Sequence, residues 1–180
     1  MIRVRACRDA DVPALLEIYA VHAGDQADRV TFEEAVPTLQ DMRARRHKVV
    51  EALHLPYIVA TMPAAGGEEE ETVVGYAYCS EFRSRAAYRR TAEVSIYVRQ
   101  ECRGSGVGST LLCALIVKAR GCNLHSLVSV MGTEEDNPGS FFLHKKYGFR
   151  EVGVLKEVGC KHGVFLDRLL MEKLLLVGEA

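Results

Sequence analysis

A glycine-rich segment in the middle of the chain, residues 103–108 (RGSGVG), has residue types that suit phosphate binding. It follows an apolar, β-branched run and precedes leucines at helical spacing, so we expect a strand, a tight turn and a helix. The first amides of a helix are free to donate hydrogen bonds at the positive end of its dipole, and glycines let an anion approach them. The segment predicts either a pyrophosphate-binding turn or an ordinary helix entry, and spacing alone does not choose between the two.

Two familiar glycine-rich loops do not match this segment. The P-loop of nucleotide hydrolases needs Lys followed by Ser or Thr after its last glycine, and no such pair is present here. The dinucleotide-binding pattern G-x-G-x-x-G needs a third glycine where Ser109 stands, and the nearest acidic candidates, Glu134 and Glu135, come late in the chain. Neither class of nucleotide-binding protein is indicated.

Composition is that of a soluble globular protein. Of 180 residues, 48% are hydrophobic and 26% are charged, with a net charge of −1. These values suit one domain over residues 1–180 and give no sign of a nucleic-acid or membrane partner. No apolar run is long enough to span a bilayer and no signal peptide is evident, so we expect a cytoplasmic protein. The six cysteines lack a C-x-x-C pair, and we expect reduced thiols, mostly in the core.

Predicted strands and helices alternate along the chain. The expected strands are 2–6, 57–61, 72–81, 91–98, 125–131, 149–157 and 164–173, and the expected helices are 9–22, a helix capped by Thr38, 105–120 and 137–147. The small and acidic residues 62–71 are expected to form a solvated loop between two paired strands. Elements mixed in this order predict an α/β or α+β layered domain.

Read in order, the motifs resemble one family. Segment 103–108 fits R/Q-x-x-G-x-G/A, the coenzyme A pyrophosphate loop of the GNAT acetyltransferase superfamily. The similarity extends to TAEVSIYV before the loop, to NPGSFFLHKKYGF after it and to VGVLKEVGCKHGVFLD in the tail. These segments resemble the phosphinothricin and methionine sulfoximine acetyltransferase branch. The loop alone is moderately specific, whereas the ordered set, within residues 2–173, is highly specific.

The resemblance implies a GNAT fold and acetyl-CoA as co-substrate. The sheet would be mixed, mostly antiparallel, of about six or seven strands, splayed in the middle and flanked by helices on both faces. Pantetheine would run along the strand backbone and the pyrophosphate would sit on the loop amides. The implied cofactor contacts are Ile96, Tyr97, Val98, Arg103, Gly104, Ser105, Gly106, Val107, Gly108, Ser109, Asn137 and Lys146. No metal is expected, because His22, His47, His54 and His125 lack ligand spacing and look like bystanders.

The resemblance also implies roles for Glu93 and His144. The acceptor would be a primary amine, which is mostly protonated at neutral pH and must lose a proton before it attacks. Glu93 matches the family's catalytic glutamate; because a carboxylate is ordinarily a weak base, burial must raise its pKa or a water must relay the proton. The alternative is a solvated charge on a strand. His144 is a candidate acid, a proton relay or a packing residue, and nearby Tyr147 is expected to be structural.

The substrate is less sharply indicated. By resemblance, Arg85, Tyr88 and Thr91 would contact an amino-acid acceptor and Phe32 would form a hydrophobic wall. The leading hypothesis is an N-acetyltransferase that acts on a small-molecule amine, an amino acid or an analogue, and forms a homodimer through its C-terminal strands. The alternatives are a protein N-terminal or lysine acetyltransferase and an acyl-CoA-binding module without turnover.

Overall fold

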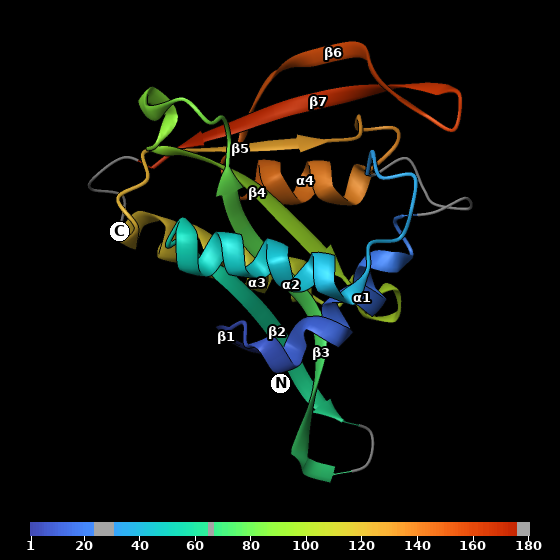
Figure 1. Cartoon of the computed structure of the whole chain (residues 1–180), viewed down its shortest axis with the longest axis vertical. Coiled ribbons are helices and arrows are strands. Elements are labelled where there is room, and N and C mark those ends of the chain that lie inside the picture. The colour runs from blue at the N-terminus through green and yellow to red at the C-terminus, as the bar shows by residue number, and fades with distance from the viewer. Residues whose placement is uncertain (24–30, 65–66, 176–180) are drawn as a thin grey trace.

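The computed structural model describes residues 1–23, 31–64 and 67–175. Its central element is a seven-stranded sheet in the order β1-β2-β3-β4-β5-β7-β6 (Figure 1). The strands are β1 Arg3–Ala6, β2 Tyr57–Ala64, β3 Gly67–Glu81, β4 Thr91–Val98, β5 Ser126–Met131, β6 Arg150–Lys161 and β7 Val164–Leu174. The helices are α1 Val12–Ala20, α2 Leu39–His47, α3 Val107–Gly121 and α4 Pro138–Lys146. Every strand pairing is antiparallel except β4 with β5.

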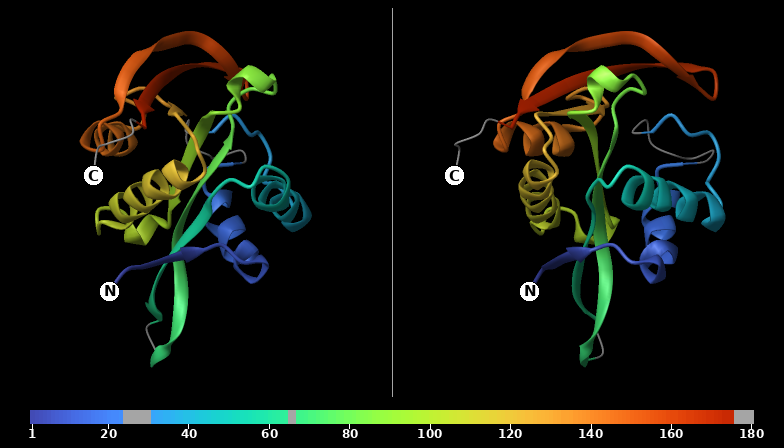
Figure 2. Two further views of the ribbon diagram at one scale, coloured as in Figure 1. Left: turned by 90° about the vertical axis from the view of Figure 1, so that its left-hand side faces the viewer. Right: turned by 60° about the vertical axis from the view of Figure 1, so that its left-hand side comes forward.

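Helices cover both faces of the sheet. Figure 2 shows the sheet nearly edge-on, with α1 and α2 on one side and α3 on the other. The α3 side holds a core that includes Leu111, Leu115 and Met171, whereas the α1–α2 side packs Leu15 and Ile18 against buried tyrosines. The architecture is therefore the layered, mostly antiparallel α/β fold that the sequence predicted.

The sheet opens in its middle. The parallel pair of β4 and β5 consists of three positions and ends where Glu93 is opposite Val128, although β4 continues to Val98. On its other side, β4 remains paired with β3 from Ala92 to Val98. The edge of β4 that faces β5 is thus left open over its second half.

The last two strands curve away from the rest of the sheet as a long hairpin (Figure 2). The exposed large apolar residues of this hairpin are Val152, Val154, Leu155, Val158, Val164 and Phe165. Among the described residues, none of the helices combines the length and apolar content that a membrane crossing requires.

Two local predictions are wrong. Residues 62–71 are not simply a loop, because β2 continues to Ala64. The carboxylate of Glu71 accepts hydrogen bonds from the side chains of Arg3 and Thr61, each over 2.9 Å. Residues 65–66 lie outside the described residues. The six cysteines are free, as expected, but only Cys7 and Cys79 are buried. Cys113 lies on the outer face of α3, on the same stripe as exposed Val117, because the helical period turns it away from the core.

Candidate active site

A cavity of about 430 Å³ lies between the open half of β4 and the N-terminus of α4. Its wall comprises His22, Ile96, Tyr97, Val98, Cys102, Arg103, Gly104, Gly108, Asp136, Asn137, Pro138, Gly139, Ser140 and Leu143. The fold therefore brings together three separate segments that the resemblance assigned to the cofactor: the strand, the glycine-rich turn and the start of the next helix.

Over its second half, the backbone of β4 pairs with no other strand of the described residues on the cavity side. The N–H of Arg99 donates to the carbonyl of Val74 on β3 over 2.9 Å. Because an antiparallel ladder alternates, Tyr97 also turns its backbone groups to β3, whereas Ile96 and Val98 turn theirs toward the opening. An extended ligand can pair with these two residues as a further strand would.

The glycines of the turn serve two purposes. Gly104 and Gly106 have φ of +78° and +90°, a region that favours glycine. A Cβ at either position would meet no atom of the described residues within 4 Å, so backbone conformation rather than crowding requires glycine there. A Cβ on Gly108 would lie 3.2 Å from Leu143, so this glycine allows α3 and α4 to pack closely. Helix α3 begins at Val107, two residues later than predicted, with Gly106 as its N-cap.

The side chains of Ser105 and Val107, in and after the turn, already interact with other parts of the protein. The hydroxyl of Ser105 donates to the carbonyl of Cys102 over 2.6 Å, and Val107 is buried in the core. Ser109 and Val107 are therefore best placed to act through their backbone amides in the first turn of α3, where such groups lack helical partners.

The residues predicted on α4 have different positions. Asn137 caps the helix by accepting a hydrogen bond from the Ser140 N–H over 3.2 Å, and it lines the cavity. Lys146 lies exposed at the other end of α4, with its ammonium 5.9 Å from the centre of the Tyr147 ring. The structure therefore places Asn137, but not Lys146, in the cavity wall.

Glu93 is the last residue of β4 that pairs with β5, at the point where the opening begins. Its neighbours Ala92 and Val94 point into the core beneath α3, so alternation directs the Glu93 side chain to the α1–α2 face. The side chain is half-buried, and this burial raises the pKa of its carboxyl above the ordinary value. A raised pKa is what the predicted role of Glu93 as a general base requires.

His144 is buried, with 3% of its surface exposed. Its Nδ1 lies 2.8 Å from the carbonyl of Ser140, which can only accept, so Nδ1 carries a proton. Burial lowers the pKa of the imidazole and outweighs the opposing effect of this hydrogen bond. Nε2 is therefore an unprotonated acceptor, and it has no hydrogen-bond partner within the described residues. The ring also packs edge-on against Phe149, with centroids 4.9 Å apart, so packing is part of its role.

The predicted substrate residues form two groups. Arg85 and Tyr88 lie exposed in the connection before β4, where Tyr88 contacts the edge of the Phe82 ring, and Thr91 begins the strand on the same face as Glu93. Phe32 lies instead beside the β6–β7 hairpin, against Gly159 and over the guanidinium of Arg168 at 3.9 Å. The sequence linked all four only through resemblance, and the structure places them on separate segments.

His22, which the sequence analysis treated as a bystander, lies in the cavity wall. Its Nε2 lies 3.2 Å from a guanidinium nitrogen of Arg103, its ring centroid is 5.7 Å from that of Tyr97, and it lines the cavity. No signal in the sequence could have found this contact, because 81 positions separate His22 from Arg103.

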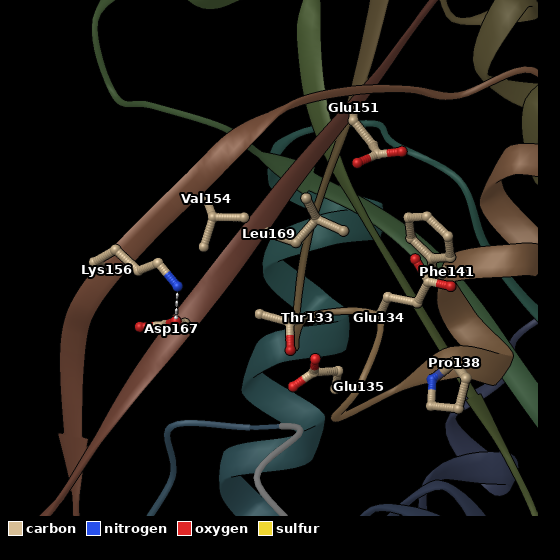
Figure 3. Close-up of a pocket in the computed structure, with 10 residues that line it drawn as sticks. All are labelled: Thr133, Glu134, Glu135, Pro138, Phe141, Glu151, Val154, Lys156, Asp167 and Leu169. Atoms are coloured by element: carbon tan, nitrogen blue, oxygen red, sulfur yellow. Dashed lines mark hydrogen bonds and ion pairs between the residues drawn. The ribbon is translucent and has the colours of Figure 1, made fainter.

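A second hollow, of about 670 Å³, lies under the β6–β7 hairpin beside α4. Figure 3 shows carboxylates of Glu134, Glu135, Glu151 and Asp167 around it, with Lys156 paired to Asp167 at 2.7 Å. Since most of its charged groups are acidic, it does not suit a pyrophosphate, and the smaller cavity beside the glycine-rich turn remains the candidate site.

Comparisons with known proteins agree with this geometry. Residues 27–149 match the acetyltransferase (GNAT) family. A phosphinothricin N-acetyltransferase of Alcaligenes faecalis is 41% identical over 176 residues, which cover 98% of this chain and 84% of that protein. A crystal structure of a GNAT superfamily phosphinothricin acetyltransferase from Sinorhizobium meliloti in complex with AcCoA has a TM-score of 0.83 and 34% identity, with 96% of this chain and 88% of that chain covered. A ribosomal-protein-alanine N-acetyltransferase from Brucella melitensis has a TM-score of 0.82 and 34% identity, with coverage of 96% and 99%.

The open sheet, the splayed strand and the glycine-rich turn, together with these matches, define the class: the chain belongs to the GNAT acetyltransferase family. More specifically, it is an acetyl-CoA-dependent N-acetyltransferase. The family, fold class and enzyme class that the motifs predicted are confirmed.

Proposed function

We propose that this enzyme acetylates the primary amine of a free amino acid or a close analogue. The observation behind the proposal is the opening that begins at Glu93, because it joins an unpaired strand edge to a half-buried carboxylate. When bound, acetyl-CoA supplies an activated acetyl thioester. The chain's own residues must hold that cofactor, orient the amine and remove its proton.

The cavity wall fits the cofactor. Backbone groups of Ile96 and Val98 face the opening and suit the amide groups of pantetheine. The amides from Arg103 to Ser109, at the positive end of α3, suit a pyrophosphate, and no atom of the described residues occupies the space where a Cβ of Gly104 or Gly106 would lie. Arg103 adds a positive charge, and its contact with His22 holds the guanidinium at the cavity wall.

Glu93 is the proposed general base. A protonated amine binds to its carboxylate and gives up the proton directly or through a water, so that the nitrogen lone pair becomes free to attack. The raised pKa of Glu93 makes it a stronger base than an exposed glutamate, and the same charge attracts the ammonium.

His144 is proposed as a proton acceptor on α4, one helical turn after Ser140 of the cavity wall. Its Nδ1 proton is held by the Ser140 carbonyl, so the group it can offer is the lone pair of Nε2. This tautomer favours a relay over a general acid, because a neutral imidazole with a deprotonated Nε2 has no proton to give there.

Similarity to phosphinothricin acetyltransferases favours an amino-acid acceptor. Similarity to the ribosomal-protein-alanine N-acetyltransferase favours a second candidate, the N-terminal amine of a peptide. We also propose a homodimer through the apolar surface of the β6–β7 hairpin, and a cytoplasmic location, which the six free cysteines favour.

Release of coenzyme A from acetyl-CoA, followed with a thiol reagent, tests the proposal. Wild type and Glu93→Ala would be compared on free amino acids, methionine sulfoximine, phosphinothricin, polyamines and short peptides, with acetyl-CoA binding measured separately. We expect turnover on an amino acid that is lost in the variant while the cofactor still binds. Turnover on peptides alone would move the function to protein modification, and binding without any turnover would leave a non-catalytic module.

A further inference from the structure

Arg168 on β7 is a buried cation without an acidic hydrogen-bond partner in the described part of the chain. Only 4% of its surface is exposed. Its Nη1 donates to the backbone carbonyl of Asp167 over 3.0 Å, whereas its Nη2 is buried with no partner in the described residues. Burial also lowers the pKa of the guanidinium. A desolvated charge with an unused donor is unfavourable unless a ligand supplies the missing acceptor.

The strand register places Arg168 on the same face of the sheet as Glu93. Glu93 is opposite Val128 on β5, and Val128 is opposite Glu172 on β7, so these three share a face. Four residues back along β7, alternation returns Arg168 to that face. The pairing of β5 with β7 ends at Leu169, so Arg168 lies just beyond the end of β5, beside the opening of the sheet.

The surroundings of Arg168 leave its Nη2 without an acceptor among the described residues. The ring of Phe32 lies over the guanidinium at 3.9 Å, and such stacking covers the face of the group while its N–H bonds point sideways in the plane. Asp136 attracts Arg168 electrostatically, but the carboxylate of Asp136 accepts a hydrogen bond from Thr133 at 3.1 Å instead. The Phe32 ring that covers the guanidinium is itself 42% exposed.

We propose that Arg168 binds the carboxylate of the acceptor, so that the enzyme selects primary amines that also carry this anion. This rests on the proposed function, in which Glu93 receives the amine end of the same molecule. A guanidinium presents two parallel donors that match a carboxylate, and a site from which water is excluded strengthens the pair. Arg168 is then the residue that distinguishes an amino acid from a simple alkylamine, a role that the exposed Arg85 had been expected to fill.

The test compares two acceptors that differ only in the carboxylate: L-methionine sulfone and 3-(methylsulfonyl)propylamine. Arg168→Met keeps an unbranched side chain against Phe32 and removes the charge, whereas Arg168→Lys keeps the charge and loses the two parallel donors of the guanidinium. For Arg168→Met we expect kcat/KM on the sulfone to fall about 10- to 100-fold, mainly through KM, as for loss of a hydrogen bond between charged groups. On the propylamine, kcat/KM of Arg168→Met should change less than about 2-fold, because this acceptor has no carboxylate for Arg168 to bind. Arg43→Met removes an exposed arginine of α2 and is the matched control.

A binding measurement keeps the proposal falsifiable if the amine is too poor a substrate. The compound 4-(methylsulfonyl)butanoate has the carboxylate without the amine, and we expect it to inhibit wild type competitively against the sulfone and to lose this effect in Arg168→Met. A loss of activity that is equal for both acceptors, or inhibition that is unchanged in the variant, would overturn the proposal and leave Arg168 as a packing residue for Phe32. If wild type releases coenzyme A with peptides only, or with no amine, the proposed function itself fails, and the role of Arg168 fails with it.

Discussion

Replacement of Gly106 by alanine tests whether the glycine-rich turn is held in the shape that a pyrophosphate needs. Gly106 has a φ of +90° at the N-cap of α3, and a Cβ added there meets no atom within 4 Å in the described part of the chain. The whole penalty is therefore conformational, about 1–2 kcal/mol for an L-residue in the left-handed region. In a domain of this size, each 1 kcal/mol lowers Tm by roughly 2–4 °C, so we expect a decrease of about 2–8 °C.

The matched control lies in the same helix. Gly121 is the last residue of α3 and has no positive φ, and a Cβ added there also meets no atom within 4 Å among the residues that the structure describes. Alanine there avoids the strain and reduces the entropy of the unfolded chain, so Gly121→Ala should leave Tm unchanged or raise it slightly. The difference between the two variants isolates the backbone conformation of the turn from the general effect of adding a methyl group.

The turn can also relieve its strain by changing shape, and the kinetic assay detects this. If the amides between Arg103 and Ser109 move, KM for acetyl-CoA should rise by about tenfold or more, equivalent to the loss of one hydrogen bond to a charged group. Thermal unfolding and coenzyme A release at varied acetyl-CoA measure the two effects separately. A Gly106→Ala protein with the Tm of Gly121→Ala and the wild-type KM for acetyl-CoA would refute the reasoning, because neither the backbone strain nor the pyrophosphate-binding turn would then exist.

Three further outcomes are expected. Because burial raises the pKa of Glu93, kcat of the wild type should fall as pH decreases through that raised pKa. In a pH–rate series, Glu93→Gln should lack this decrease and have a kcat about 100-fold lower. Between the ordinary and the raised pKa the folded protein binds more protons than the unfolded one, so the free energy of unfolding decreases as pH rises across this interval; urea titrations should find this slope in wild type and not in Glu93→Gln. Gly159→Ala places a methyl group where the Phe32 ring lies. Displacement of the ring should raise KM for the amino acid several-fold and leave KM for acetyl-CoA unchanged. A parallel rise in both KM values would contradict the assignment of Phe32 to the acceptor side.

Local features of the sequence predicted local structure well. Thr38 and Asp41 form the expected capping box, in which each backbone N–H donates to the other side chain, at 2.9 and 3.1 Å. Strand β4 runs over the predicted residues 91–98, and the turn after it contains two glycines with positive φ. Such features depend on residues a few positions apart, whose interactions are the same in any fold that contains them.

Burial was harder to predict where a residue's environment comes from a distant element. Cys113, Cys122 and Cys160 are exposed although their residue type favours the core. Lys146 matches a cofactor-side motif but lies at the far end of α4 from the cavity. A motif gives the position of a residue along a helix, whereas the face and end that meet the ligand depend on how the helix packs.

By itself, the sequence determined the class of the enzyme: the order of its motifs predicted the family, the splayed sheet and the three segments that line the candidate cavity. Only the tertiary structure decided which side chains meet across that sheet. It placed His22 beside Arg103, and Phe32 over Arg168, pairs that are 81 and 136 positions apart. The physical reason is that burial is produced by neighbours from other elements. The raised pKa of Glu93 and the Nη2 of Arg168, which has no partner in the described residues, both follow from burial and have no counterpart in the local sequence.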